Sequence, residues 1–289
     1  QWLLRDGSAN SLFDLGNAEA NEWLCEYIGD FIEQNGIDYY RQDFNMAAAH
    51  YWAKYDEPKR IGMKEIRYVE GIYKYWDYLL ERFPQMIIDN CASGGRLLDI
   101  EMAKRSIPLW RTDYTVSGQG VTTVASGVRS QGANLTWWLP ISGGMGNSEG
   151  VGNEYGFRSY MASGATMGRF GDKTWADKMI GEMVYNRELM LGDYYILQQG
   201  LHEGLVDDTS NGWWMESDAS RDYTDTTDAA YEFYREDLGE GYLVTFRPNH
   251  STETYQIYKL KGLDAHAQYE VRDADTGETS VRSGRYLME

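Results

Sequence analysis

The sequence predicts an α/β fold with a small all-β region at its carboxyl end. Up to about residue 195, short runs rich in β-branched and aromatic residues alternate with longer segments of helical apolar spacing, the order typical of a parallel α/β fold. Beyond that point, short alternating runs are separated by Gly, Asn and Asp, as in antiparallel β structure. A length of 289 residues, 42% of them apolar, suits one large domain or a large domain with a small partner.

Six strands are expected in the first part of the chain. Each is a short β-branched or aromatic run that lies between helical segments. The predicted strands are 11–16, 36–44, 85–91, 107–114, 133–140 and 159–167.

Three long helices are expected between these strands. Residues 17–36 carry apolar residues at helical spacing, and Asn17 is placed to cap the first turn. The same spacing predicts helices over 62–83 and 172–191, with shorter helical pieces near 97–105 and 121–131.

Five runs in the last third of the chain alternate polar and apolar residues and predict strands of the all-β region. They are 212–218, 229–237, 241–250, 254–260 and 267–277.

The charge balance excludes two classes of partner. A formal net charge of −18 would repel the phosphates of nucleic acids and of anionic membranes.

No run approaches the roughly 18 uncharged apolar residues of a membrane helix, and the first ten residues lack the features of a signal peptide. A cytoplasmic location is therefore expected.

Metal and cofactor chemistry is not indicated. Two cysteines, Cys25 and Cys91, cannot form a four-ligand zinc site, and the four histidines have no metal-binding spacing. Aromatic residues make up 14% of the chain, which suits both sugar-binding clefts and large cores.

Polar residues gather at the ends of three predicted strands. The first ends in Arg41, Gln42, Asp43, Phe44 and Asn45, the second runs through Asp89, Asn90 and Cys91 into a Gly94-Gly95 loop, and the third ends in Arg111, Thr112 and Asp113. In a parallel α/β barrel such ends face one mouth. Asp43 and Arg41 share one side of a strand, as do Asp113 and Arg111. A single aspartate there is more often a turn or helix cap, but two aspartates that each follow an arginine by two residues favour catalysis.

The segments LFDLGNAEANEWL, GIDYYRQDFNM, IDNCASGGRLLDIEM and WRTDYT, in this order, resemble family 36 glycoside hydrolases, which are retaining α-galactosidases and α-N-acetylgalactosaminidases. The resemblance runs to about residue 195. Family members commonly have Lys-Trp-Asp at positions 41–43 and Ser-Asp-Asn at 112–114, so this chain differs in its sugar-binding details.

The resemblance implies a role for each matched position. Asp43 is expected to be the nucleophile and Asp113 the general acid/base, with no cofactor. Arg41 would bind sugar hydroxyls, and Cys91, Gly94 and Gly95 would line the sugar pocket. Asn45 and Arg111 complete the expected substrate-binding residues. The guanidinium of Arg41 favours an ionised Asp43, whose charge in turn favours a protonated Asp113.

Only six strands precede the all-β region, whereas a complete barrel has eight strands and about 250 residues. We therefore expect an incomplete (β/α)8 TIM barrel, about strands 3 to 8, over residues 1–197. A small all-β sandwich domain should occupy residues 198–289, and both termini of the chain are expected to be cut. The uncovered sheet edge favours self-association, which makes a homo-oligomer a candidate partner.

The sequence predicts an exo-glycosidase that hydrolyses terminal α-linked galactose. One alternative keeps the mechanism and changes the sugar to N-acetylgalactosamine or galactosamine. A second is a non-catalytic carbohydrate-binding protein or an inactive fragment, and a third treats Asp43 and Asp113 as turn caps only.

Overall fold

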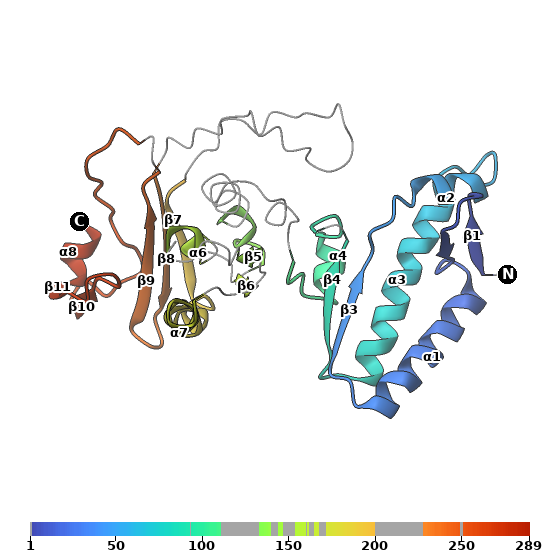
Figure 1. The fold of residues 1–289 in the computed structure, drawn as a ribbon, viewed down its shortest axis with the longest axis horizontal. Coiled ribbons are helices and arrows are strands. Elements are labelled where there is room, and N and C mark those ends of the chain that lie inside the picture. The colour runs from blue at the N-terminus through green and yellow to red at the C-terminus, as the bar shows by residue number, and fades with distance from the viewer. Residues whose placement is uncertain are drawn as a thin grey trace. The chain divides into compact units, whose positions relative to one another are not determined.

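The computed structural model describes residues 2–92, 94–110, 133–139, 144–146, 154–159, 161, 165–167, 172–199, 228–248 and 251–289 (Figure 1). The chain divides into two compact units, Gln1–Arg111 and Thr112–Glu289. The described elements are a mixture of helices and strands, so the predicted α/β class is confirmed in this broad sense.

The first unit holds a β-hairpin, a parallel strand pair and four helices. Its elements in chain order are β1 (Leu3–Arg5), β2 (Ser11–Phe13), α1 (Ala18–Asn35), β3 (Tyr39–Asp43), α2 (Ala49–Tyr55), α3 (Met63–Arg82), β4 (Ile87–Cys91) and α4 (Ile100–Ala103).

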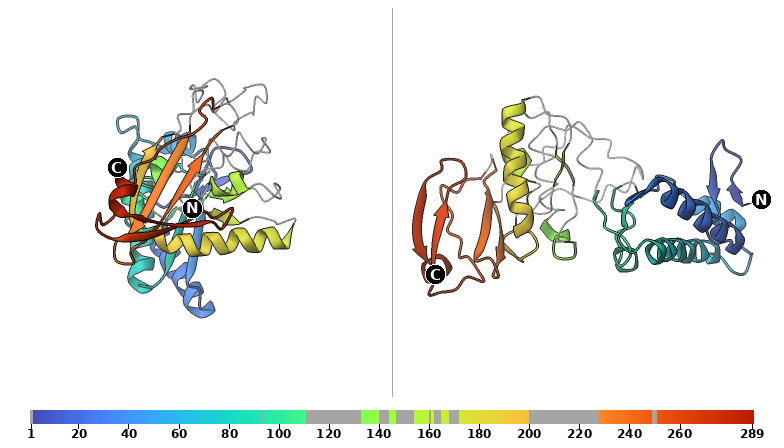
Figure 2. Two further views of the ribbon diagram at one scale, coloured as in Figure 1. Left: turned by 90° about the vertical axis from the view of Figure 1, so that its left-hand side faces the viewer. Right: turned by 90° about the horizontal axis from the view of Figure 1, so that it is seen from below.

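Helices α1 and α3 confirm the two long helices predicted in this part of the chain. The Asn17 side chain accepts a hydrogen bond from the Ala20 N–H at 3.0 Å and caps α1, as its position predicts. Helix α1 ends at Gly36, whose φ of 62° is the left-handed conformation that closes many helices. The two helices pack against each other (Figure 2).

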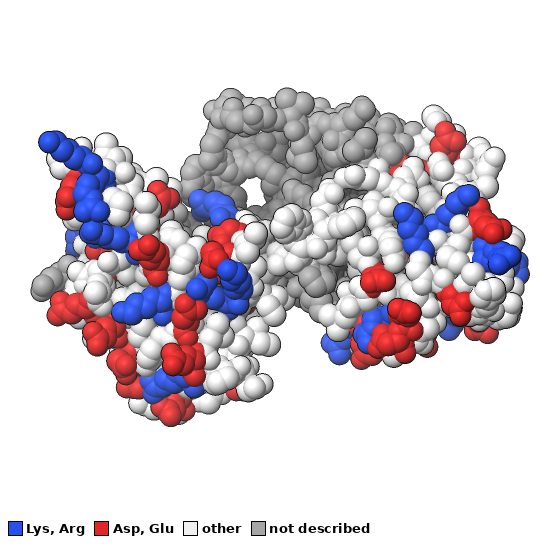
Figure 3. Space-filling view, turned by 180° about the vertical axis from the view of Figure 1, so that it is seen from behind, with Lys and Arg blue, Asp and Glu red and all other residues white. Residues whose placement is uncertain are grey.

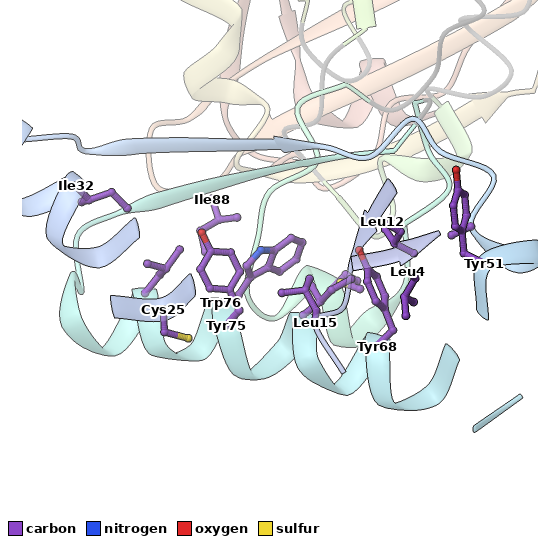
Figure 4. Close-up of a cluster of buried hydrophobic side chains, with 14 of the residues drawn as sticks. Leu4, Leu12, Leu15, Cys25, Ile32, Tyr51, Tyr68, Tyr75, Trp76 and Ile88 are labelled. Atoms are coloured by element: carbon purple, nitrogen blue, oxygen red, sulfur yellow. The ribbon is translucent and has the colours of Figure 1, made fainter. Parts of the chain in front are cut away.

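The core of the first unit lies between α1, α3 and the strands. Figure 4 shows Tyr68, Tyr75 and Trp76 on one side of α3, together with Ile88 of β4, in one cluster of buried side chains. Trp76 and Leu79 are fully buried, which fixes the distance between α3 and the strand pair.

Strands β3 and β4 form a parallel pair, with Arg41 opposite Asp89 and Asp43 opposite Cys91. Ile107, the first residue of the predicted strand 107–114, forms a further parallel bridge with Asp89 of β4. Parallel pairing brings the carboxyl ends of β3 and β4 to the same edge.

The described residues of the second unit form a three-stranded antiparallel sheet and two further strand pairs. Its elements in chain order are β5 (Gly144–Gly146), α6 (Glu154–Arg158), β6 (Ala165–Met167), α7 (Lys173–Leu189), β7 (Asp193–Gln198), β8 (Ala229–Arg235), β9 (Glu240–Phe246), β10 (Gln268–Arg272), β11 (Thr279–Ser283) and α8 (Gly284–Met288).

Helix α7 confirms the predicted helix over 172–191 and packs against β8 and β9 (Figures 1 and 2). Met179 of α7 and Phe233 of β8 are fully buried in one cluster. The sheet order is β7-β8-β9, and β10 pairs with β11 in a separate antiparallel hairpin. The strands predicted within 229–237, 241–250 and 267–277 are therefore confirmed.

The predicted strands 133–140 and 11–16 differ in the structure. Residues 133–135 form a helical turn, because the N–H groups of Trp138 and Leu139 bond to the Leu135 carbonyl. Trp137 and Trp138 are both exposed, at 67% and 72%. The strand at 11–13 pairs antiparallel with β1, which makes it part of a hairpin and not a barrel strand.

Residues 254–260 contain no strand. At the end of this run, the backbone N–H groups form no strand pairing. The Leu260 N–H donates to the Leu287 carbonyl, and the Lys261 N–H donates to the Glu232 carboxyl group. The predictions over 121–131 and 212–218 lie outside the described residues.

Acidic and basic side chains are intermixed on the face seen in Figure 3. Arg82 of α3 forms ion pairs with Asp30 and Glu33 of α1. In the described part of the chain, no helix is long and apolar enough to span a membrane.

Candidate active site

The two sides of β3 have different surroundings. Tyr40 and Gln42 point toward α3, where the Tyr75 hydroxyl donates to the Tyr40 hydroxyl at 3.1 Å and the Trp76 indole N–H donates to Gln42 at 3.0 Å. Side chains alternate along a strand. Tyr39, Arg41 and Asp43 therefore share the side that faces away from α3.

Asp89 is the most buried polar group on that side, with 1% of its surface exposed. Its Oδ2 accepts hydrogen bonds from the Tyr39 hydroxyl at 2.5 Å and from the Arg41 guanidinium, and its Oδ1 accepts from the Leu109 N–H at 3.1 Å. A buried carboxylate is costly unless donors surround it. Two side-chain donors from β3 and one backbone donor, the Leu109 N–H, satisfy this one.

Arg41 lies between two carboxylates. One guanidinium nitrogen binds Asp89, and the other is 3.8 Å from Oδ2 of Asp43. Burial opposes the charge on Arg41, but the hydrogen bond and the charge of Asp89 raise its pKa above the ordinary value. Arg41 is therefore positively charged at neutral pH.

Cys91 is buried and lies opposite Asp43 in the register of β3 against β4. Burial, together with the negative charge of Asp43, raises the pKa of Cys91 to about 11. The thiol is therefore protonated at neutral pH and can donate a hydrogen bond. Asp43 is partly exposed, at 38% of its side chain, so a ligand can reach it.

The chain turns directly after β4. Gly94 has a φ of 73°, which favours glycine at this position. The Ala92 N–H donates to the Gly94 carbonyl at 3.3 Å, and Ala92 pairs with Gly95. The turn keeps the Gly94-Gly95 backbone close to Cys91 at the end of the strand.

The structure brings together Arg41, Asp43 and Cys91 of the predicted site, with Gly94 and Gly95 in the adjoining turn. Asn45 lies two residues beyond Asp43 and is exposed. Asp113 and Arg111 lie outside the described residues.

Sequence reasoning assigned no role to Tyr39 or Asp89. The available signal was their place on the two predicted strands, one on the same side as Arg41 and the other just before Cys91. Only the register of β3 against β4 shows that Asp89 lies opposite Arg41.

The arrangement suits nucleophilic or acid–base chemistry at a carboxylate. Asp43 is reachable from solvent, and a guanidinium and a thiol lie beside it. Among the residues that the structure describes, no cluster of His, Cys, Asp and Glu could hold a metal ion.

Residues 4–124 match the family model described as Melibiase. The bifunctional alpha-galactosidase/sucrose kinase AgaSK of Mediterraneibacter gnavus is 28% identical over 104 residues, which cover 36% of this chain and 10% of that protein. The matched segments span 10% to 18% of the length of eight curated relatives, which are named as alpha-galactosidases or probable alpha-galactosidases.

Solved structures resemble the chain over almost its whole length. GH36 alpha-galactosidase AgaB from Geobacillus stearothermophilus aligns with a TM-score of 0.72 and 20% identity, covering 99% of this chain and 38% of that one. AgaA from the same organism, solved in complex with raffinose, aligns with a TM-score of 0.70 and 20% identity over the same shares. This likeness concerns the fold. Residues 4–124 are similar to the melibiase family, which confirms the predicted resemblance to the family 36 α-galactosidases.

Proposed function

We propose that the chain is the catalytic part of a retaining exo-glycosidase that hydrolyses terminal α-linked galactose. One observation carries the proposal: Asp43 ends a parallel strand within the melibiase segment, is reachable from solvent, and has Arg41 and Cys91 beside it. The similar proteins named above support the sugar, since they are α-galactosidases and AgaA was solved with raffinose.

In the proposed reaction, Asp43 attacks the anomeric carbon while Asp113 gives its proton to the glycosidic oxygen, and the aglycone leaves as an alcohol. The product of this step is a galactosyl ester on Asp43. Asp113, now ionised, takes a proton from water, the water oxygen attacks the same carbon, and Asp43 is released. Two inversions leave the configuration retained.

The proposal assigns sugar binding to residues around Asp43. Arg41 would bind sugar hydroxyls with the nitrogens that face Asp43. The protonated Cys91 thiol can donate to an oxygen, and the Gly94-Gly95 backbone leaves room for a close approach. Asn45 and Arg111 complete the proposed set.

The finer architecture is also part of the proposal. We place an incomplete (β/α)8 barrel at residues 1–197 and a β sandwich at 198–289. The parallel β3–β4 pair with helices on one face supports the barrel, and the antiparallel strands β8 to β11 support the sandwich. A cytoplasmic location and self-association are tested by cell fractionation and by size-exclusion chromatography with light scattering.

Hydrolysis of nitrophenyl α-galactoside by the purified chain tests the activity. Asp43→Asn should lose at least 10²-fold in turnover, since nucleophilic and acid–base groups are commonly worth that much. Asp38→Asn, an exposed aspartate just before β3, is the matched control and should keep wild-type activity. An Asp43→Asn variant with more than about a tenth of wild-type turnover would contradict the assignment.

Trapping with a 2-deoxy-2-fluoro galactoside should label Asp43, and the first product seen by proton NMR should be the α-anomer. A label elsewhere, or a β-anomer first, would overturn the proposed mechanism.

Faster hydrolysis of the 2-acetamido substrate would assign the sugar as N-acetylgalactosamine. Galactose binding without turnover would assign a non-catalytic binding role.

A further inference from the structure

Asp89 lies at the middle of the β3–β4 pair, where it connects β3, β4 and the Leu109 backbone and binds Arg41, which lies beside the proposed nucleophile. Its oxygens accept from Tyr39 of β3, from Arg41 of β3 and from the Leu109 backbone. The Asp89 side chain is 2% exposed, whereas the Arg41 and Asp43 side chains are 37% and 38% exposed. The ion pair of Arg41 with Asp89 is therefore the sheltered one and the pair with Asp43 is the solvated one.

This difference decides where the guanidinium stays. An exposed ion pair contributes about 0 to 1 kcal/mol and is easily broken, whereas the charge of a buried carboxylate needs its partner. Arg41 is thus held by Asp89. At 3.8 Å, its other nitrogen is beyond hydrogen-bond distance of Asp43.

Holding Arg41 in this position has a chemical consequence. A free arginine next to a carboxylate prefers the two-pronged pair in which both carboxylate oxygens accept N–H bonds. Such a pair would engage the lone pairs that a nucleophile uses for attack. With one nitrogen held by Asp89, Arg41 supplies positive charge to Asp43 and leaves its oxygens available.

We propose that Asp89 is a positioning residue that acts through Arg41. It holds the guanidinium near Asp43 and prevents Arg41 from forming a bidentate pair with the Asp43 carboxylate. This inference rests on the proposed function of Asp43 as nucleophile. Tyr39 assists, since its hydroxyl donates to the same Asp89 oxygen that Arg41 contacts. Burial, and to a smaller extent the hydrogen bond to Asp89, raises the pKa of Tyr39 to about 12. The Tyr39 hydroxyl is therefore protonated at neutral pH and can donate to Asp89.

A merely structural role is the competing explanation, because Asp89 also ties Leu109 to β4. A double-mutant cycle separates the two. Asp89→Asn keeps the side-chain volume and an acceptor for the Leu109 N–H, but removes the charge that holds Arg41. We expect it to lower kcat/KM about 10- to 100-fold when Arg41 is present, since small misplacements at a reacting centre have such effects.

In an Arg41→Ala background, the same Asp89→Asn change should lower kcat/KM less than about 3-fold, because the residue through which Asp89 acts is gone. An equal loss in both backgrounds would overturn the positioning role and assign a structural one. If Asp89→Asn does not fold, Tyr39→Phe replaces it in the same cycle, with a smaller expected loss that again requires Arg41.

A second measurement does not depend on turnover. With ¹⁵N-labelled arginine, a guanidinium held on Asp89 should give separate NMR signals for its two Nη groups, assigned to Arg41 by their loss in Arg41→Lys. Merged Arg41 signals in Asp89→Asn support the positioning role, and unchanged separate signals overturn it. A wild-type chain inactive on every α-galactoside would refute the proposed function while this readout still tests the hold on Arg41.

Discussion

The second unit contains a buried acid whose replacement should make the protein more stable above neutral pH. Glu232 lies on β8 with 3% of its surface exposed. Its carboxyl oxygens accept from the Lys261 N–H at 2.9 and 3.2 Å. Burial raises the pKa of Glu232 from an ordinary 4.5 to about 7, against the opposing effects of that hydrogen bond and of the Lys261 charge.

The sign follows from proton linkage. Between pH 4.5 and about 7 the folded chain keeps a proton on Glu232 that the unfolded chain has released. The contribution of Glu232 to stability is therefore fully present below the unfolded pKa and is lost as the pH rises through the folded pKa. The loss amounts to about 3 kcal/mol.

Glu232→Gln removes the ionisation and keeps a carbonyl oxygen that can accept from the Lys261 N–H. The lost second acceptor costs about 0.5 to 1.5 kcal/mol at any pH. At pH 8 the variant should therefore be more stable than the wild type by about 2 kcal/mol. Near pH 4.5 it should be equal or slightly less stable.

The two compact units can unfold separately, so a global transition need not report on β8. Amide hydrogen exchange of peptides from Ala229–Arg235, followed by mass spectrometry from pH 5 to 8, measures the stability of this sheet, after correction for the intrinsic pH dependence of exchange. Glu270→Gln, on the exposed side of β10, is the matched control and should follow the wild type. Wild-type and Glu232→Gln curves that stay parallel over this range would refute the reasoning.

Three further changes concern the first unit, each measured by urea denaturation followed by circular dichroism. Gly71→Ala should destabilise it by about 1 to 3 kcal/mol or more, because a Cβ there would lie 2.1 Å from the Leu15 carbonyl oxygen; an unchanged midpoint would show that α3 can shift freely. Asn17→Ala should cost about 1 kcal/mol through the lost helix cap, and Asn17→Asp should restore most of it. Leu79→Ala should cost about 2 to 5 kcal/mol, since this side chain is fully buried, and a cost below 1 kcal/mol would contradict the core.

Local structure in the first unit followed from the sequence to a large extent. The apolar spacing and the cap at Asn17 predicted α1, and the same spacing predicted α3. The alternation of side chains along a strand predicted that Arg41 and Asp43 share a side. These features depend on residues a few positions apart, which is why they can be read from the chain.

Errors arose at two runs whose backbone bonds differ from those of a strand. The aromatic run at 133–140 has strong strand propensity, yet its backbone bonds locally to Leu135 in a helical turn. The run at 254–260 alternates like a strand, but the next N–H group, on Lys261, bonds to the buried Glu232 carboxyl group. The first bonds are local and the second joins residues 29 positions apart, and strand propensity predicts neither.

The sequence by itself determined the residue types of the candidate site, their order and the face that Arg41 and Asp43 share. Only the tertiary structure decided that this face turns away from α3 and that Asp89 lies opposite Arg41. These two strands are joined by some forty residues, and their register depends on how Tyr75 and Trp76 pack under β3. Packing is a property of the whole unit. It determines that the Asp89 carboxylate is buried against Arg41 and that the Asp43 carboxylate stays accessible to a ligand.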